Sequence, residues 1–121
     1  MQFDLSLPQD GLFFKSYDDD FIEINGQKFH QAFHVNFSSV TQLDSLTFDD
    51  VSATTFAQAI MEKPELIIIG CGPLQKFLHP KIHAYLAEHK IGLEVMVTPA
   101  ALRTFNVLKG EGRKVWAWVF F

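Results

Sequence analysis

A chain of 121 residues, 48% of them apolar and 20% charged, has the composition of a globular protein rather than a disordered one, and we predict a single domain over residues 1–121. Its net charge of −4, with ten basic residues scattered along the chain, argues against nucleic acid and anionic membrane surfaces as partners. The apolar runs are far shorter than the ~20 residues that span a bilayer, so we expect no membrane insertion.

The first half of the chain has the pattern of an antiparallel β unit. Residues 21–24 lead into Asn25-Gly26, a dipeptide that favours two-residue hairpin turns because both positions tolerate positive φ. The return strand is predicted over residues 28–37, with its apolar side chains at odd-numbered positions: Phe29, Phe33, Val35 and Phe37.

The second half alternates strands with helices. Strands are predicted over residues 65–69, 93–97 and 115–120, the last apolar at every position and therefore interior to a sheet. The helix-start signals are Ser52, Pro80 and the pair Thr98-Pro99, and Gly110 is the expected C′ residue of the last helix. The side chains expected to face inward are Phe56, Ala57, Ile60 and Met61, then Ile82, Tyr85 and Leu86, then Ala101, Leu102, Phe105 and Leu108. Such spacing implies right-handed crossovers and a mostly parallel core.

Several short motifs are specific enough to indicate a relationship. They are Tyr17-Asp18-Asp19, Ile24-Asn25-Gly26, Gly70-Cys71-Gly72, Gly92-Leu93-Glu94-Val95-Met96 with Thr98, Arg103-Thr104-Phe105-Asn106 with Leu108, and Glu111-Gly112-Arg113. Through them the chain resembles a family of small domains of unknown function that includes mitochondrial respiratory complex I assembly factor three, an adipogenesis-associated domain protein and short bacterial proteins. The chain departs from the family pattern at Cys71, where threonine is common, and at Val97, where aspartate is common.

The resemblance implies an α/β fold of three layers. The central sheet is expected to be mixed and largely parallel, with helices on both faces and an N-terminal antiparallel β unit. The family carries no established catalytic residues, so the resemblance assigns none to this chain.

The strand end at Gly70 is the most site-like place in the sequence. In open α/β sheets, ligands bind outside the carboxyl ends of the strands, where helix N-termini supply free N–H groups. We therefore predict a ligand site, for a small anion, formed by Gly70, Cys71, Gly72, Thr98 and Arg103. The alternative is a tight turn that needs only backbone freedom, and neither nucleotide-binding glycine motif is complete.

Two further constellations involve cysteine and histidine. Cys71 is a nucleophile in one interpretation, with His79 as its base, and a small buried filler in the other. The pairs His79/His83 and His30/His34 each lack the third and fourth ligands of a zinc site, so we predict no metal and no cofactor. His79 then serves simply as a helix-start residue before Pro80.

Charged and polar residues near the last helix also admit two interpretations. Arg103 and Asn106 are three residues apart on one helix, and Glu94 and Arg113 flank or lie within predicted strands. They are either a polar pocket with Arg103 as an anion clamp or buried charges that pair with each other and fix the helix to the sheet.

The function predicted from these observations is a non-enzymatic protein-interaction or assembly-factor-like domain. The alternative is a small-anion-binding protein or an unrecognised enzyme that uses the Gly70–Gly72 strand end. A protein partner is expected without its identity, and the sequence does not define the oligomeric state. The single cysteine and the absence of a recognisable targeting segment favour the cytoplasm.

Overall fold

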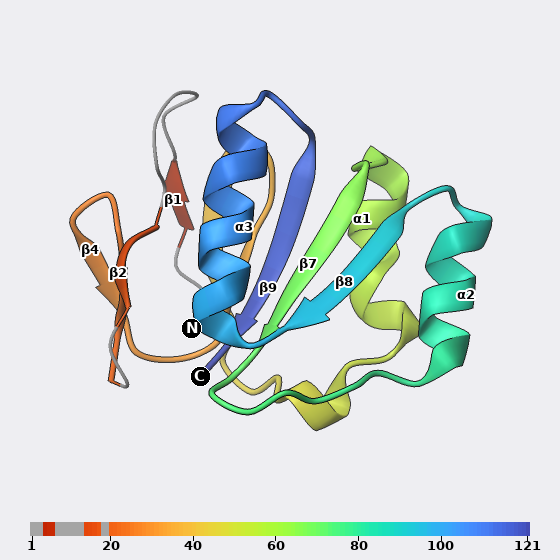
Figure 1. Cartoon of the computed structure of the whole chain (residues 1–121), viewed down its shortest axis with the longest axis horizontal. Helices are drawn as coiled ribbons and strands as arrows, with labels where there is room; N and C mark the ends of the chain where they lie inside the picture. Colours follow the sequence, from red (N-terminus) through yellow and green to blue (C-terminus); the bar gives the residue numbers. More distant parts are fainter. Residues whose placement is uncertain (1–3, 7–13, 18–19) are drawn as a thin grey trace.

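Two β-sheets and three α-helices make up the part of the chain described by the computed structural model, residues 4–6, 14–17 and 20–121 (Figure 1). The larger sheet contains, in spatial order, β1 (Asp4–Ser6), β6 (Ser39–Gln42), β5 (Phe33–Val35), β9 (Val115–Phe120), β7 (Leu66–Cys71) and β8 (Gly92–Met96). The smaller sheet contains β2 (Phe14–Tyr17), β3 (Ile22–Ile24) and β4 (Gln27–Phe29). The helices are α1 (Ala57–Glu62), α2 (Pro80–Glu88) and α3 (Thr98–Gly110), and two 3₁₀ turns, η1 (Phe48–Asp50) and η2 (Ala53–Phe56), precede α1.

The larger sheet is mixed, which confirms the predicted fold class. Strands β9, β7 and β8 run parallel, joined by crossovers that contain α2 and α3, whereas β5 pairs antiparallel with both β9 and β6. The smaller sheet is an antiparallel meander at the N-terminal side of the chain. Asp18 and Asp19 of the upstream family motif lie outside the described residues.

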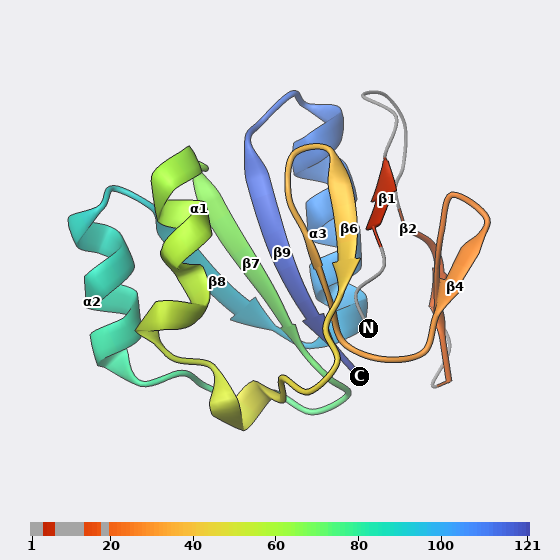
Figure 2. The same ribbon diagram turned by 180° about the vertical axis from the view of Figure 1, so that it is seen from behind.

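The central sheet separates two apolar cores. Side chains at successive positions of a strand point to opposite faces, so Val115, Ala117 and Val119 of β9 face α3 and the smaller sheet. The intervening Trp116 and Trp118 face α1 and α2. In Figure 2, α1 and α2 lie over the β7–β8 side of this second face, and no helix of the described residues covers β6.

The hairpin at Asn25-Gly26 is confirmed, because φ is 49° at Asn25 and 84° at Gly26. The single return strand predicted over residues 28–37 is wrong. It is split into β4 and β5, which belong to different sheets. The chain turns between them, and Gln31 holds the corner by donating from Nε2 to the carbonyl oxygen of Leu43 at 2.8 Å. As a result Phe33 packs in the core on the α3 side of the sheet, whereas Phe37 packs in the core on the side of α1 and α2.

The helix predicted from Ser52 begins as the 3₁₀ turn η2, and only α1 is α-helical. A 3₁₀ turn advances each side chain by 120° rather than 100°, which shifts the buried face of the following helix. Met61 is therefore 81% exposed instead of buried, Ala57 is also exposed, and Ala59 occupies the core.

Two details of the later helices also differ from prediction. Tyr85 is exposed, and Leu86 is the buried residue of α2. At the end of α3, Gly110 is still helical and the positive φ of 78° falls at Gly112. Among the described residues, no helix has the length and apolar character needed to cross a membrane.

Candidate functional site

The predicted ligand turn, Gly70-Cys71-Gly72, ends β7 in a closely packed place. A Cβ atom on Gly70 would lie 2.9 Å from Thr98 Oγ1, and one on Gly72 would lie 3.1 Å from the carbonyl oxygen of Phe121. Gly72 also has φ of 98°, a conformation that side chains rarely adopt. The two glycines therefore let the start of α3 and the C-terminal residue approach the end of β7.

Thr98 is fully buried and joins three elements at this turn. Its Oγ1 accepts a hydrogen bond from Gly72 N at 2.8 Å and donates one to the carbonyl oxygen of Phe120 at 2.6 Å. Its backbone N–H donates to the carbonyl oxygen of Gly72 at 2.9 Å. The predicted capping role of Thr98 is wrong, because Val97 is the N-cap of α3 and the threonine hydroxyl is used across the sheet.

Arg103 lies away from the turn. Five residues along an α-helix amount to a rotation of about 140°, so Arg103 faces a different side of α3 from Thr98. Its side chain is exposed and borders a shallow hollow on the helix with Val107. The structure thus brings together Gly70, Cys71, Gly72 and Thr98 but not Arg103, and the anion-binding role of this set stays a prediction.

Arg103 and Asn106, three residues apart on α3, do not share a pocket. Asn106 Nδ2 donates to the carbonyl oxygen of Phe14 at 2.9 Å, and its Oδ1 accepts from Phe14 N at 3.1 Å. One side-chain amide thereby pairs with both backbone groups of a residue in β2. Asn106 fastens the smaller sheet to α3.

Glu94 and Arg113 are exposed, so the interpretation of them as buried charges is wrong. Arg113 Nε lies 3.5 Å from Glu65 Oε1, and the other oxygen of Glu65 accepts a hydrogen bond from Lys114 N at 3.0 Å. That hydrogen bond, followed by the charge of Arg113, lowers the pKa of Glu65 below its ordinary value. The contacts join the starts of β7 and β9, at the opposite end of these strands from the predicted turn.

Cys71 and His79 are each engaged in separate local interactions. Cys71 is 2% exposed, and its Sγ donates to the carbonyl oxygen of Leu74 and accepts from Lys76 N, both at 3.4 Å. His79 Nδ1 accepts from Lys81 N at 3.0 Å, which confirms its role at the start of α2. Over residues 4–6, 14–17 and 20–121, no group of three or more potential metal ligands was found.

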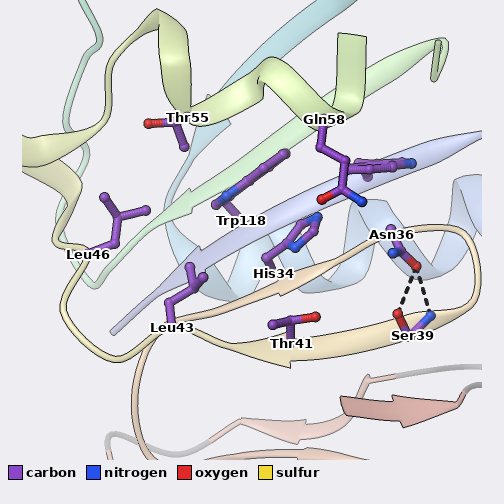
Figure 3. Close-up of a pocket in the computed structure, with 10 residues that line it drawn as sticks. His34, Asn36, Ser39, Thr41, Leu43, Leu46, Thr55, Gln58 and Trp118 are labelled. Carbon is purple, nitrogen blue, oxygen red and sulfur yellow. Dashed lines mark hydrogen bonds between the residues drawn. The ribbon is translucent and has the colours of Figure 1, made fainter. Parts of the chain in front are cut away.

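A pocket of about 510 Å³ lies elsewhere, on the face of the larger sheet beside η2 and α1 (Figure 3). Its floor consists of side chains from β5 and β9: His34, Trp116 and Trp118. Leu43 and Leu46 line one end. The polar lining comes from the segment after β5, from β6, η2 and α1: Asn36, Ser39, Thr41, Thr55 and Gln58.

The floor of this pocket is an aromatic cluster. The His34 ring is stacked on Trp118, with centroids 4.4 Å apart and an interplanar angle of 23°, and lies 5.0 Å from Trp116. Phe56 packs its edge against Trp118 at 4.9 Å. Such mutual packing holds the rings in defined positions. Figure 3 shows the His34 ring pointing from β5 toward Gln58, with Thr41 on the neighbouring strand.

The polar lining of the pocket is held in place by hydrogen bonds and carries little charge. Asn36 Oδ1 accepts hydrogen bonds from Ser38 N, Ser39 N and Ser39 Oγ at 2.9–3.1 Å, which fixes the turn between β5 and β6. Of the described side chains that line the pocket, His34 is the only one with an ionisable group. The arrangement can hold an uncharged group by apolar contact and hydrogen bonds.

This pocket was not predicted from the sequence, in which His34 was considered only as half of a zinc pair and the strand over residues 115–120 only as an interior strand. The available signal was the spacing of Trp116 and Trp118, since side chains two apart on a strand share a face. Their neighbours in the pocket depend on the order of the strands in the sheet.

Together, the mixed sheet, its crossover helices and the added antiparallel meander define an α/β domain of a kind found in other solved structures. An NMR structure of a Mth938-like domain from Bordetella pertussis has a TM-score of 0.75 and 26% identity, covering 88% of this chain and 84% of that one. The family model described as "Protein of unknown function (DUF498/DUF598)" matches residues 14–120, and the chain belongs to this family. This finding confirms the resemblance seen in the motifs.

Two further proteins are similar to this chain. A crystal structure of a protein from Bordetella parapertussis has a TM-score of 0.79 and 31% identity, covering 88% of this chain and 92% of that one. NADH dehydrogenase [ubiquinone] 1 alpha subcomplex assembly factor 3 from Bos taurus is 28% identical over 104 residues, which are 84% of this chain and 56% of that protein. The chain spans about half the length of the curated relatives it matches.

Proposed function

We propose that this chain is a non-enzymatic protein-interaction domain with an assembly-factor-like role. The curated relatives support an assembly role, although the matches cover only 56% and 42% of their lengths and their partners are not assigned to this chain. The observation that carries the proposal is in the loop between β7 and α2, where two large apolar side chains are exposed. Leu74 is 74% exposed and Phe77 is 82% exposed.

The backbone of this loop is anchored although its apolar side chains face solvent. Gln75 Nε2 donates to the carbonyl oxygens of Lys76 at 2.8 Å and of Val95 in β8 at 3.2 Å. The Sγ of Cys71 contacts backbone groups of Leu74 and Lys76. An anchored loop loses little conformational entropy on binding, and buried aromatic side chains often dominate the energy of protein interfaces. Leu74 and Phe77 have the properties of such contact residues.

The proposal is tested by affinity purification of the tagged chain from its own host, followed by mass spectrometry. Wild type is compared with the double variant Leu74→Ser and Phe77→Ser. Met61→Ser is the matched control, because Met61 is as exposed as Phe77 but lies on α1. We expect at least one protein to be enriched by wild type and by the control and lost from the double variant. If wild type enriches no protein, or all three chains enrich the same set, the proposal fails.

We also propose that the chain resides in the cytoplasm. The support is the single cysteine, whose thiol is free and buried, as is usual in reducing compartments. Fractionation of the host checks this location, and recovery of the protein mainly from an exported or organellar fraction would contradict it.

A further inference from the structure

The aromatic pocket on the α1 face of the larger sheet is separate from the loop between β7 and α2 that carries Leu74 and Phe77, since neither residue lines it. We propose that it binds a small uncharged molecule that carries a planar cyclic amide, such as a pyrimidine nucleoside. The inference goes beyond the proposed function, because it assigns a ligand class to a different surface of the molecule.

The size and charge of the pocket define the kind of ligand it can accept. A volume of about 510 Å³ lies within the range of small-molecule sites, roughly 300–1,000 Å³. Among the lining residues that the structure describes there is no lysine, arginine, aspartate or glutamate. An ionic group placed against this lining would lose water without gaining a permanently charged partner, which favours an uncharged ligand.

The hydrogen-bonding groups select an amide. Trp116 is fully buried, and its Nε1–H has no hydrogen-bond partner in the described part of the chain. A buried donor of this kind is uncommon, and a carbonyl oxygen on a ligand would satisfy it. Gln58 Nε2 lies 3.5 Å from Glu62 Oε2, so its Oε1 is the atom that can accept an N–H from a ligand.

A cyclic amide presents a carbonyl oxygen and an N–H side by side on one ring. Its carbonyl would accept from Trp116, its N–H would donate to Gln58, and its ring faces would contact apolar side chains of the lining. The Nε1 atom of Trp116 is covered in this structure. Binding therefore requires a side-chain movement that opens Nε1 of Trp116 to the pocket, and such rotamer changes are common on binding.

The test uses the full chain labelled with ¹⁵N, which shows two indole N–H signals because it has two tryptophans. The variants Trp116→Phe and Trp118→Phe assign them. Uridine and 2-pyridone are the probes. The control 2-methoxypyridine keeps the ring but lacks the amide. We expect both probes to move the Trp116 indole signal saturably toward lower field, with no comparable shift from the control.

A matched pair of protein variants locates the contact. Gln58→Ala should weaken 2-pyridone binding about threefold to tenfold, the usual loss for one neutral hydrogen bond, whereas Met61→Ser on the same helix should leave it unchanged. If neither probe moves the Trp116 signal in wild type, or if 2-methoxypyridine moves it equally, the inference is wrong. A negative result here does not bear on the loop between β7 and α2, because the substitutions of Leu74 and Phe77 do not change any residue that lines the pocket.

Discussion

At the scale of single residues, Thr98 combines full burial with two side-chain hydrogen bonds. Its hydroxyl bridges Gly72 N and the carbonyl oxygen of Phe120 in a region without solvent. Thr98→Val keeps the shape but leaves the Gly72 N–H without its acceptor, and an unsatisfied buried group costs about 1–3 kcal/mol. We expect a loss of this size in the free energy of unfolding, measured with urea.

The control for this change is Thr98→Ser, which retains the hydroxyl. It should be more stable than Thr98→Val. Equal stability of the two variants would show that the hydroxyl bridge is not what matters at this position.

Substitution of Arg103 tests the predicted anion site. Because Arg103 is exposed, and no ion pair involving it was found among the described residues, Arg103→Ala should change stability by less than about 0.5 kcal/mol. If the Gly70–Gly72 turn and Arg103 bind an anion, inorganic phosphate should shift the backbone amide signals of Gly72 and Arg103 in wild type and not in the variant. Absence of a phosphate shift in wild type would remove the anion site. A large loss of stability would instead restore a structural role for Arg103.

At the scale of elements, Glu65 links the starts of β7 and β9. Its pKa is lowered in the folded chain, so the charged form stabilises the fold above the ordinary glutamate pKa. That contribution disappears as pH falls through the lowered pKa. Glu65→Gln should therefore melt below wild type near pH 7, and the difference should shrink below about pH 4.

The measurement is the melting temperature of both chains across this pH range. Glu88→Gln is a suitable control, since it removes the same charge from the exposed side of α2. A difference between Glu65→Gln and wild type that stays constant, or grows, in acid would contradict the assignment. The effect is small because Glu65 is exposed and solvent screens its ion pair with Arg113.

The strands also show which parts of the fold the sequence patterns can predict. The strands predicted over residues 93–97 and 115–120 match β8 and β9 within one residue, because buried apolar runs bounded by turn signals have few alternatives. The transfer of the chain from β4 to β5 was not predictable in this way. The alternation of Phe29, Phe33 and Val35 continues through the corner, which is held by contacts such as Gln31 to Leu43.

The candidate sites show the same limit: short motifs are visible in the sequence, whereas contacts between distant residues are not. The family motifs identified Gly70, Gly72 and Thr98 as special positions, and their local conformations and contacts explain why. The sequence did not reveal that the Thr98 hydroxyl is used by Phe120, a residue 22 positions away. The His34 pocket needs β5 to lie beside β9, and that order is set by tertiary packing.

At the scale of the whole molecule, the central sheet is covered unequally. Its parallel half is enclosed between α3 on one face and α1 with α2 on the other (Figures 1 and 2). The antiparallel half packs its α3-side face in the core that includes the smaller sheet, while the opposite face carries the pocket. The pocket thus follows from a short α1 that does not extend over β6.

The placement of both tryptophans on this one face has an optical consequence. Their ring centroids are 5.9 Å apart, and they are the only tryptophans in the chain. At that separation the two indoles couple electronically, so the tryptophan bands of the near-ultraviolet circular dichroism and the tryptophan fluorescence of the unlabelled protein both originate at the pocket floor. An event that fills or opens the pocket alters these spectra directly. The spectra carry no indole signal from α3 or the smaller sheet. A change in the tryptophan signal of the native chain therefore reports a change on the pocket face of the sheet.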